Sequence, residues 1–299
     1  MMSWLKFLWE ESKYETRVLW SLSWRVSLTF FASYSLNVVN ALFAGRLGTL
    51  QLAGLGLGSL MCNVTGLSVA VGLLGAMDTL CPQAYGAKQY PVVGFVAQRA
   101  VLICTLALIP IILLWIFVED ILLALGQEPV PSKYAAVYAR TLCFGIPAFM
   151  CFEAMKRFLQ AQAVVNPMLY VVGVAAVLHP LWCWLLSANF GFIGIPISTC
   201  ITFWTMALLL LFYILLRRPH RPETWPGFNG LEARSCWGEY LKLALPAMAM
   251  LCLPWWAFEV LALGAGSIST VALASHTILA TIDPLAFMLP LGSLRQRGA

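Results

Sequence analysis

Charged residues are scarce in this chain, and long stretches contain none. Only 10% of its 299 residues are Asp, Glu, Lys or Arg, and 61% are hydrophobic, whereas a soluble chain is typically about 25% charged. The 59 residues from Phe158 to Leu216 carry no charged side chain. Further uncharged stretches are Val26–Gly45, Leu47–Met77, Ala100–Val118 and Val260–Ile282. Because a membrane-spanning helix needs about 20 apolar residues and satisfies its own backbone hydrogen bonds, this pattern predicts an all-α polytopic membrane protein.

The chain also lacks the motifs on which most enzymes and metal sites depend. Its nine cysteines form no CxxC pair, and a cysteine in an apolar stretch is usually a small packing residue. There is no HExxH, no GxSxG and no Walker lysine loop. We therefore expect no metal and no organic cofactor, and His179 should pack in the interior or bond to a neighbouring helix rather than bind a metal. The net charge of +5 lies in short loops, which argues against a nucleic-acid partner.

Eight apolar spans are predicted. They cover residues 22–44, 50–80, 92–118, 133–160, 167–188, 191–216, 240–264 and 268–293. Proline and glycine mark most of the joints, and the longest loop, at about residues 217–239, has the composition of a linker. We therefore divide the chain into an N-terminal segment (1–20), a six-helix bundle (21–216), a linker (217–239), the first two helices of a second, incomplete bundle (240–294) and a tail (295–299).

The distribution of cations predicts the orientation of the spans. If the N-terminal segment is cytosolic, 15 of the 18 lysine and arginine residues fall on the cytosolic side, and only Arg46, Lys133 and Arg140 fall outside. Cytosolic loops carry the excess of Lys and Arg in membrane proteins. We therefore expect a cytosolic N-terminus and a cytosolic linker, in either the plasma membrane or an organelle membrane.

The chain after the linker resembles its own beginning. Leu42–Ala53 joins the first predicted span to the second, and Leu261–Ala272 joins the seventh to the eighth. Both stretches have a glycine where the first span of the pair ends, Gly45 and Gly264, and an alanine eight residues later. Internal repeats are typical of transporters, whose substrate sites lie between the repeats. If the second unit copies the first, four helices are missing from it.

From about residue 20 onwards, several short motifs follow one another in the order and spacing of a known protein family. The most specific are Gln83–Ala87 (QAYGA) and Pro254–Glu259 (PWWAFE). The weaker ones are Phe43–Gly48 (FAGRLG), Leu52–Gly54 (LAG), Thr65–Ala70 (TGLSVA), Phe158–Gln162 (FLQAQ) and Asn166–Pro167. Together they resemble the multidrug and toxin extrusion (MATE) family of transporters, in its eukaryotic branch.

This resemblance implies a twelve-helix antiporter of two six-helix lobes, which exports organic cations or other toxic compounds in exchange for protons or sodium. The chain would hold the whole N-terminal lobe and helices 7 and 8, and would be truncated after helix 8. Its acidic residues depart from the family. Bacterial members often carry an aspartate where this chain has Asn40, and animal and plant relatives often carry acidic residues where it has Pro254 and Thr281.

Glu259, in the seventh span, is the main candidate for binding the coupling ion or the substrate. A carboxylate at mid-bilayer is costly, so we expect it to face polar partners or a water-filled cavity. There it could bind a proton and a cationic solute in turn. Trp255 and Trp256 lie about one turn away and could offer aromatic faces to an organic cation. The alternative is a structural hydrogen bond from Glu259 to a neighbouring helix.

A polar cleft is predicted between the first two spans and the seventh. Asn37 and Asn40 are three residues apart and should share a helix face. With Asn63 they are cavity candidates, although hydrogen bonds between helices explain these three asparagines equally well. Gln160 is a further cavity candidate. Small residues of the second span would also line the cleft, namely Gly54, Gly58, Gly66 and Gly72.

Two polar residues near the cytosolic end of the second span, Asp78 and Gln83, are assigned a gating or structural role. Arg99 is one expected partner of Asp78. Glu153 and Arg157 are four residues apart on a predicted helix, so a local ion pair is expected there.

Two functions from different classes follow. The first is a secondary active antiporter that exports a small organic solute, cationic or amphipathic, across the lipid bilayer in exchange for protons or sodium. The second is a transport-inactive membrane protein that acts only through interactions, with the seventh and eighth spans exposed to lipid or to a partner. An integral membrane enzyme is the least favoured alternative, because no catalytic constellation is present.

Overall fold

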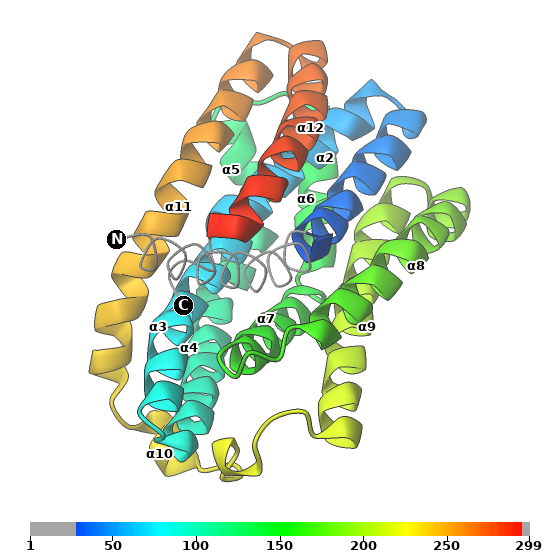
Figure 1. Cartoon of the computed structure of the whole chain (residues 1–299). Coiled ribbons are helices and arrows are strands. Elements are labelled where there is room, and N and C mark those ends of the chain that lie inside the picture. Colours follow the sequence, from blue (N-terminus) through cyan, green and yellow to red (C-terminus); the bar gives the residue numbers. More distant parts are fainter. Residues whose placement is uncertain (1–27, 295–299) are drawn as a thin grey trace, which may run out of the picture.

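The computed structural model describes residues 28–294, without the side chains of Phe258 and of residues 283–294. This part of the chain is almost entirely helical and contains no β-strand (Figure 1). The elements are the first helix (Leu28–Leu47), α2 (Thr49–Cys62), η1 (Asn63–Leu67), α3 (Ser68–Gly86), α4 (Tyr90–Ile116), α5 (Val118–Ala124), α6 (Pro129–Leu142), α7 (Ile146–Gln160), α8 (Asn166–Phe190), η2 (Gly191–Ile193), α9 (Gly194–Arg217), η3 (Pro222–Thr224), α10 (Gly230–Arg234), α11 (Trp237–Ile268) and α12 (Thr270–Leu294). The predicted segments 1–20 and 295–299 lie outside the described residues.

Each of the eight predicted spans falls on described helices, although the eighth, α12, counts only as a shorter apolar helix over Thr270–Ile282. Five segments of the described chain are long and apolar enough to cross a membrane. One of them, residues 166–217, folds back at Gly191 (φ 60°) into α8 and α9, which lie side by side. The helices α6 and α7, which meet at an angle of 56°, pass the same test only as a pair, as a broken span would. The all-α polytopic architecture is confirmed, and the division into two lobes stays a prediction.

Gly145 and Pro147 mark the break between α6 and α7. Pro147 lies in the first turn of α7, where its missing N–H costs no helical hydrogen bond. Gly145 allows α9 to approach closely, because a Cβ at this position would lie 2.9 Å from the Sγ of Cys200. The bend lets α7 pack against α3, α4 and α9.

The second span, formed by α2, η1 and α3, lies at the centre of the molecule and packs against α4, α6, α7, α11 and α12. Small residues let helix backbones approach closely in a membrane, and four glycines of this span serve that purpose. At each of them a Cβ would stand within 3 Å of a neighbouring residue: Gly54 of Tyr134, Gly58 of Tyr138, Gly66 of Trp115 and Gly72 of Met248. The prediction that these glycines line a polar cleft is therefore wrong, since they are helix-packing positions.

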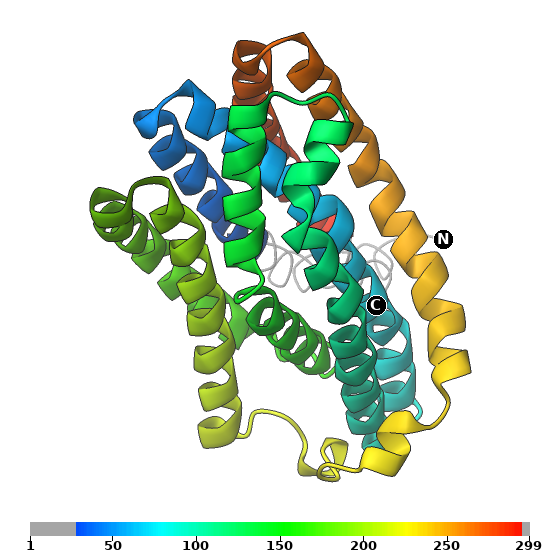
Figure 2. The ribbon, with the colours of Figure 1, turned by 180° about the vertical axis from the view of Figure 1, so that it is seen from behind.

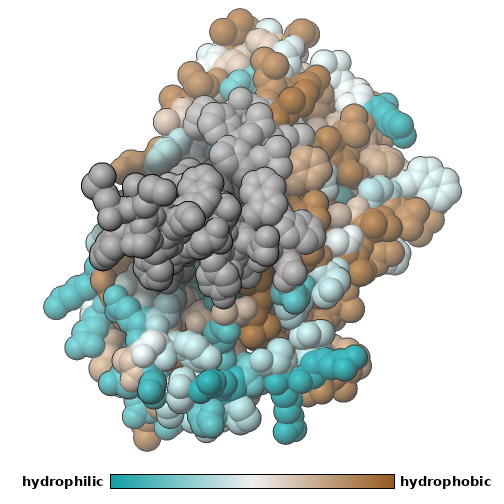
Figure 3. All heavy atoms as spheres, in the orientation of Figure 1, coloured by the Kyte–Doolittle hydropathy of each residue, from teal (hydrophilic) through white to brown (hydrophobic). Residues whose placement is uncertain are grey.

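The predicted linker is a folded strap that contains η3 and α10 and runs from α9 to α11 along one end of the molecule (Figures 1 and 2). The Gln162 side chain accepts hydrogen bonds from the Arg221 backbone at 3.1 Å and from the Thr224 hydroxyl at 3.3 Å. Arg99 of α4 donates to the Glu232 carbonyl oxygen at 3.2 Å. Hydrophilic side chains gather at this end, which we call the linker end (Figure 3). The linker is thus fixed to the ends of α4 and α7.

The two helices after the linker form a hairpin against the second span, with α11 along α3 and α12 along α2 (Figure 1). Tyr240 is fully buried and donates from α11 to the Leu73 carbonyl oxygen at 2.9 Å. Tyr34 of the first helix donates to the Ala280 carbonyl oxygen of α12 at 2.9 Å. Large apolar side chains of the hairpin are exposed, as expected for helices that contact lipid: Met250, Leu253, Val260, Leu261, Ile268, Val271 and Leu279.

Candidate transport site

Glu259 lies on the side of α11 that faces the second span. Its Oε1 accepts a hydrogen bond from the Asn63 side-chain amide at 3.4 Å, and its side chain is half-buried. This distance exceeds the roughly 2.7–3.2 Å usual for such a bond, so the bond is weak. A carboxylate in hydrocarbon is costly unless it binds a proton, a cation or hydrogen-bond donors. Glu259 therefore has the placement that an ion- or cation-binding group needs, although its role stays a prediction.

Asn63 reaches Glu259 from a place where the winding of the second span changes. Residues Asn63–Leu67 form η1, a π-helical turn between α2 and α3. Such turns are rare inside α-helices and are frequent at functional sites. Of the two explanations for Asn63, a cavity lining and a bond between helices, the structure shows the bond.

Trp255 and Trp256 precede Glu259 on α11 and are 50% and 37% exposed. Trp255 is four residues before Glu259, so the two side chains share a helix face. An aromatic ring in this position can attract a cation that approaches the carboxylate. The role of the two rings in binding a cation stays a prediction.

A second polar cluster, whose pairing the sequence did not reveal, is buried between the first helix, α8 and α9. His179 is fully buried; its Nδ1 lies 2.8 Å from the Thr202 hydroxyl, and its Nε2 lies 3.1 Å from the Asn40 Oδ1. The Asn40 amide donates to the Thr199 hydroxyl at 3.1 Å. His179 thus bonds to neighbouring helices, as expected. Asn40 is only 3% exposed, so it belongs to the packed interior and does not line an open cavity.

Asn37, in contrast, is exposed. It lies three residues after Tyr34, whose hydroxyl bonds to α12, and three residues before Asn40, which is buried against α8 and α9. The two asparagines therefore have different surroundings. The prediction that both line one open cavity is wrong for Asn40, and a cavity role for Asn37 stays a prediction.

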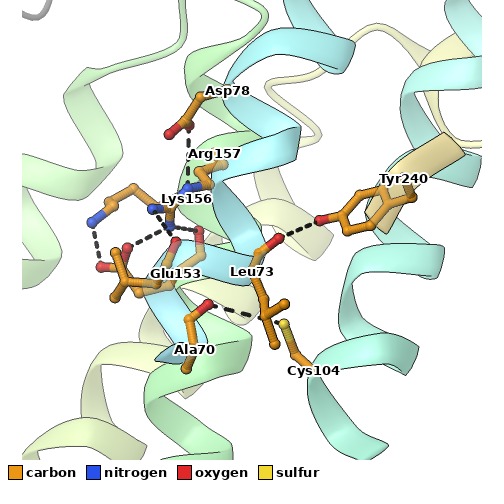
Figure 4. A network of polar contacts seen from close by, with 9 residues as sticks. Ala70, Leu73, Asp78, Cys104, Glu153, Lys156, Arg157 and Tyr240 are labelled. Carbon is orange, nitrogen blue, oxygen red and sulfur yellow. Dashed lines mark hydrogen bonds and ion pairs between the residues drawn. The ribbon is translucent and has the colours of Figure 1, made fainter. Parts of the chain in front are cut away.

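Asp78 belongs to an ion cluster that joins α3 to α7 (Figure 4). The buried Arg157 lies with its Nε 3.2 Å from Asp78 Oδ1 and with its Nη1 2.6 Å from Glu153 Oε2, and Lys156 also pairs with Glu153. The predicted Glu153–Arg157 pair is confirmed. The partner expected for Asp78 was wrong, because α7 packs against α3 while Arg99 bonds to the linker. The cluster ties the second span to the fourth.

The two remaining candidates also lie near the linker end. Gln83, in the last turn of α3, is exposed. Gln160, at the end of α7, lines a cavity of about 20 Å³ together with Thr29 and Ser33 of the first helix. Such a volume holds about one water molecule. This cavity is too small for an organic solute, so among the described residues the cavity role of Gln160 stays a prediction.

Comparison with known proteins agrees with this architecture. The MatE family model matches residues 26–185. Protein DETOXIFICATION 16 of Arabidopsis thaliana is 35% identical over 263 residues, which are 87% of this chain and 54% of that protein. Multidrug and toxin extrusion protein 1 of Danio rerio is 32% identical over 286 residues, which are 93% of this chain and 48% of that protein. The chain thus spans about half the length of the curated relatives it matches.

Among solved structures, the eukaryotic MATE transporter AtDTX14 superimposes with a TM-score of 0.85 and 27% sequence identity, covering 93% of this chain and 63% of that one. The described helices therefore follow the arrangement of a MATE transporter. Since the matching family model also spans more than half of the sequence, this chain belongs to the multidrug and toxin extrusion (MATE) family.

Proposed function

We propose that the protein is a secondary active antiporter that exports organic, cationic or amphipathic, solutes in exchange for protons or sodium. One observation carries the proposal: Glu259 is half-buried on α11, opposite the second span, with Asn63 as its hydrogen-bond partner. Family membership supports a transporter and points away from an enzyme. Because the chain spans about half of its relatives, the activity of the whole protein is part of the proposal.

Exchange follows if the Glu259 carboxylate binds one positive charge at a time. A proton on the carboxyl removes the charge that attracts a cationic solute, and a bound solute cation excludes the proton. Trp255 adds an aromatic face on the same side of α11. In transporters built from repeats such a site lies near the bilayer midplane, where it can open to either side in turn. Competition for one carboxylate would thus couple the two fluxes.

Two features support the placement of the chain in a lipid bilayer and its orientation there. The apolar surface of the hairpin suits a lipid bilayer, and the excess of lysine and arginine on the linker side supports a cytosolic N-terminus.

The test is transport by purified protein in proteoliposomes under an imposed pH or sodium gradient, with a fluorescent organic cation as substrate. It uses this chain and, in parallel, any longer protein that contains it. We expect gradient-dependent efflux that falls to background in Glu259→Gln and is partly retained in Glu259→Asp. Glu239→Gln, which changes an exposed carboxylate of the same helix, should transport normally. Unchanged exchange in Glu259→Gln would refute the assignment.

One observation favours a second function, a transport-inactive protein that acts through interactions. The hairpin exposes many large apolar side chains, including Met250 and Ile268, and such a surface can bind another membrane protein as well as lipid. The same experiment separates the two functions. If neither form moves an organic cation under any gradient, while the hairpin can be cross-linked to a specific membrane protein, the second function is the correct one.

A further inference from the structure

The π-helical turn η1 lies where the second span contacts α4 on one side and α11 on the other. A π turn inside an α-helix is rare, and such turns are frequent at functional sites, so the contacts made by this one are of interest. In this span both neighbours supply specific contacts, and each contact involves a polar residue of the turn. The turn therefore connects a group on α4 with the carboxylate on α11.

On the α4 side, the turn is held by Trp115. This side chain is fully buried, and its indole N–H donates to the Thr65 hydroxyl at 2.8 Å. The same hydroxyl donates to the Met61 carbonyl oxygen, so it is bonded as donor and as acceptor. Gly66 leaves room for the ring, because a Cβ there would stand 2.2 Å from the ring atom Cζ2. The Trp115 ring thus packs against Gly66, and its N–H is hydrogen-bonded to Thr65.

On the α11 side, the turn presents Asn63, its first residue, to Glu259. An amide carries both a donor and an acceptor. It can therefore donate to the ionised carboxylate and, after turning over, accept from the protonated carboxyl. A leucine of similar size could do neither, and the charged form of Glu259 would then lose its described donor.

We propose that Trp115 is a positioning residue for Glu259, acting through the π turn and Asn63. Trp115 holds the π turn in place through its contacts with Thr65 and Gly66. The turn then keeps the Asn63 amide next to Glu259, where the amide stabilises the ionised carboxylate. This inference rests on the proposed function only for its consequence in transport. The physical link from α4 to the carboxylate can be measured without transport.

The measurement is labelling of Glu259 by a hydrophobic carbodiimide, which reacts with the protonated carboxyl, followed by peptide mass spectrometry. Losing one hydrogen bond to the ionised form should raise the labelling rate at pH 7 roughly two- to tenfold. We expect this increase in Asn63→Leu and in Trp115→Phe, which keeps the ring and removes the N–H. The plateau rate at low pH should not change, because access of the reagent is unaltered.

Non-additivity is the decisive result. If Trp115 acts through Asn63, the double variant Asn63→Leu, Trp115→Phe labels no faster than Asn63→Leu alone. Trp204→Phe is the matched control, because it removes an indole bond to the Phe144 carbonyl oxygen, away from Glu259. It should label like the parent protein. Additive effects, or normal labelling of Trp115→Phe, would overturn the proposal.

A second pair of variants covers the case in which Trp115→Phe does not fold. Thr65→Val removes the hydroxyl that Trp115 binds, and Thr65→Ser restores it. We expect fast labelling in Thr65→Val and normal labelling in Thr65→Ser, a rescue that general loosening of the helix does not predict. Equal labelling of the two variants would count against the link. If labelling behaves as expected but no variant changes exchange, the positional link stands and the proposed role of Glu259 fails.

Discussion

The helices before the linker (residues 28–217), which we call the lobe, and the α11–α12 hairpin hold their polar side chains in different ways. In the lobe, His179 is bonded through both ring nitrogens, and Arg157 contacts two carboxylates and the Val71 carbonyl oxygen. On the hairpin, Glu259 is half-buried and has one long bond, from Asn63. A buried group bonded on several sides holds helices together, because each lost partner leaves an unsatisfied group. A carboxylate with a single described partner retains capacity to bind a ligand.

This difference predicts that stability and activity separate along the chain. Substitutions in the bonded clusters of the lobe should lower the free energy of unfolding. Substitutions at Glu259 should change exchange and leave folding almost intact. The loss in free energy of unfolding should be largest for the buried ion cluster, smaller for the His179 cluster and smallest for Glu259 and the linker.

The largest loss of stability is expected for Arg157→Met. The substitution leaves Glu153 buried with one cation fewer and removes the bond to Asp78 that joins α7 to α3. Breaking a buried ion pair from one side costs about 3–5 kcal/mol. Lys156→Met removes the less buried partner of Glu153 and leaves the Arg157 pair in place, so it should cost less than Arg157→Met. Denaturant unfolding in mixed micelles measures both, and equal losses would show that burial of Arg157 is not what matters.

This cluster also shows how far the sequence alone can be read. Spacing of four residues on one helix predicted the Glu153–Arg157 pair, because neighbours on one helix are set by its period. The contact between Asp78 and Arg157 joins two spans, and apolar spans of similar composition do not reveal which of them are adjacent. Arg99 has the right charge and distance along the chain, yet its side chain bonds to the linker. The spans could be predicted from stretches without charged residues, whereas the contacts between spans could be learned only from the structure.

The same limit applies to the candidate site. Glu259 was identifiable because one carboxylate in an apolar stretch is costly. Its partner Asn63 could not be chosen among three asparagines, since a π turn has no reliable sequence signature. The glycines of the second span were assigned to a cleft because small residues mark both cavities and close helix contacts. Only the positions of Trp115, Met248 and the α6 tyrosines distinguish these two cases.

A smaller loss of stability, about 1–3 kcal/mol, is expected for His179→Leu. The substitution leaves the Asn40 Oδ1 and the Thr202 hydroxyl without their bonds to the ring. Asn40→Leu should cost a similar amount, and the double variant should cost less than the sum, because both changes remove the same bond. Unfolding titrations of the single and double variants measure this coupling. Strict additivity would mean that the two side chains act independently.

Glu259→Gln should change the free energy of unfolding by less than about 1 kcal/mol. The glutamine still offers an oxygen to the Asn63 amide, and it removes a charge that is costly in hydrocarbon. The same substitution at Glu153 is the matched comparison, because it removes the charge facing Arg157 and Lys156 and should cost about 3 kcal/mol or more. Unfolding titrations decide the matter. If Glu259→Gln is as damaging as Glu153→Gln, Glu259 is a structural residue and the contrast between the two regions fails.

The smallest effect concerns the strap between the regions, through His220. Burial lowers the pKa of His220 below its usual value of 6.5, and the nearby charge of Arg218 lowers this pKa further. The ring packs edge-on against Phe158 of α7, with 5.7 Å between centroids. Docking of the linker therefore favours neutral His220. The stabilisation of the docked linker by His220 is present above about pH 6.5 and is lost as the pH falls toward the lowered pKa.

Limited proteolysis of the linker should be faster at pH 5.5 than at pH 7.5. His220→Phe keeps an aromatic ring and cannot be protonated. The ratio of the cleavage rate of the parent protein to that of His220→Phe should therefore rise from pH 7.5 to pH 5.5. A ratio that is the same at both pH values would mean that protonation of His220 does not affect the linker.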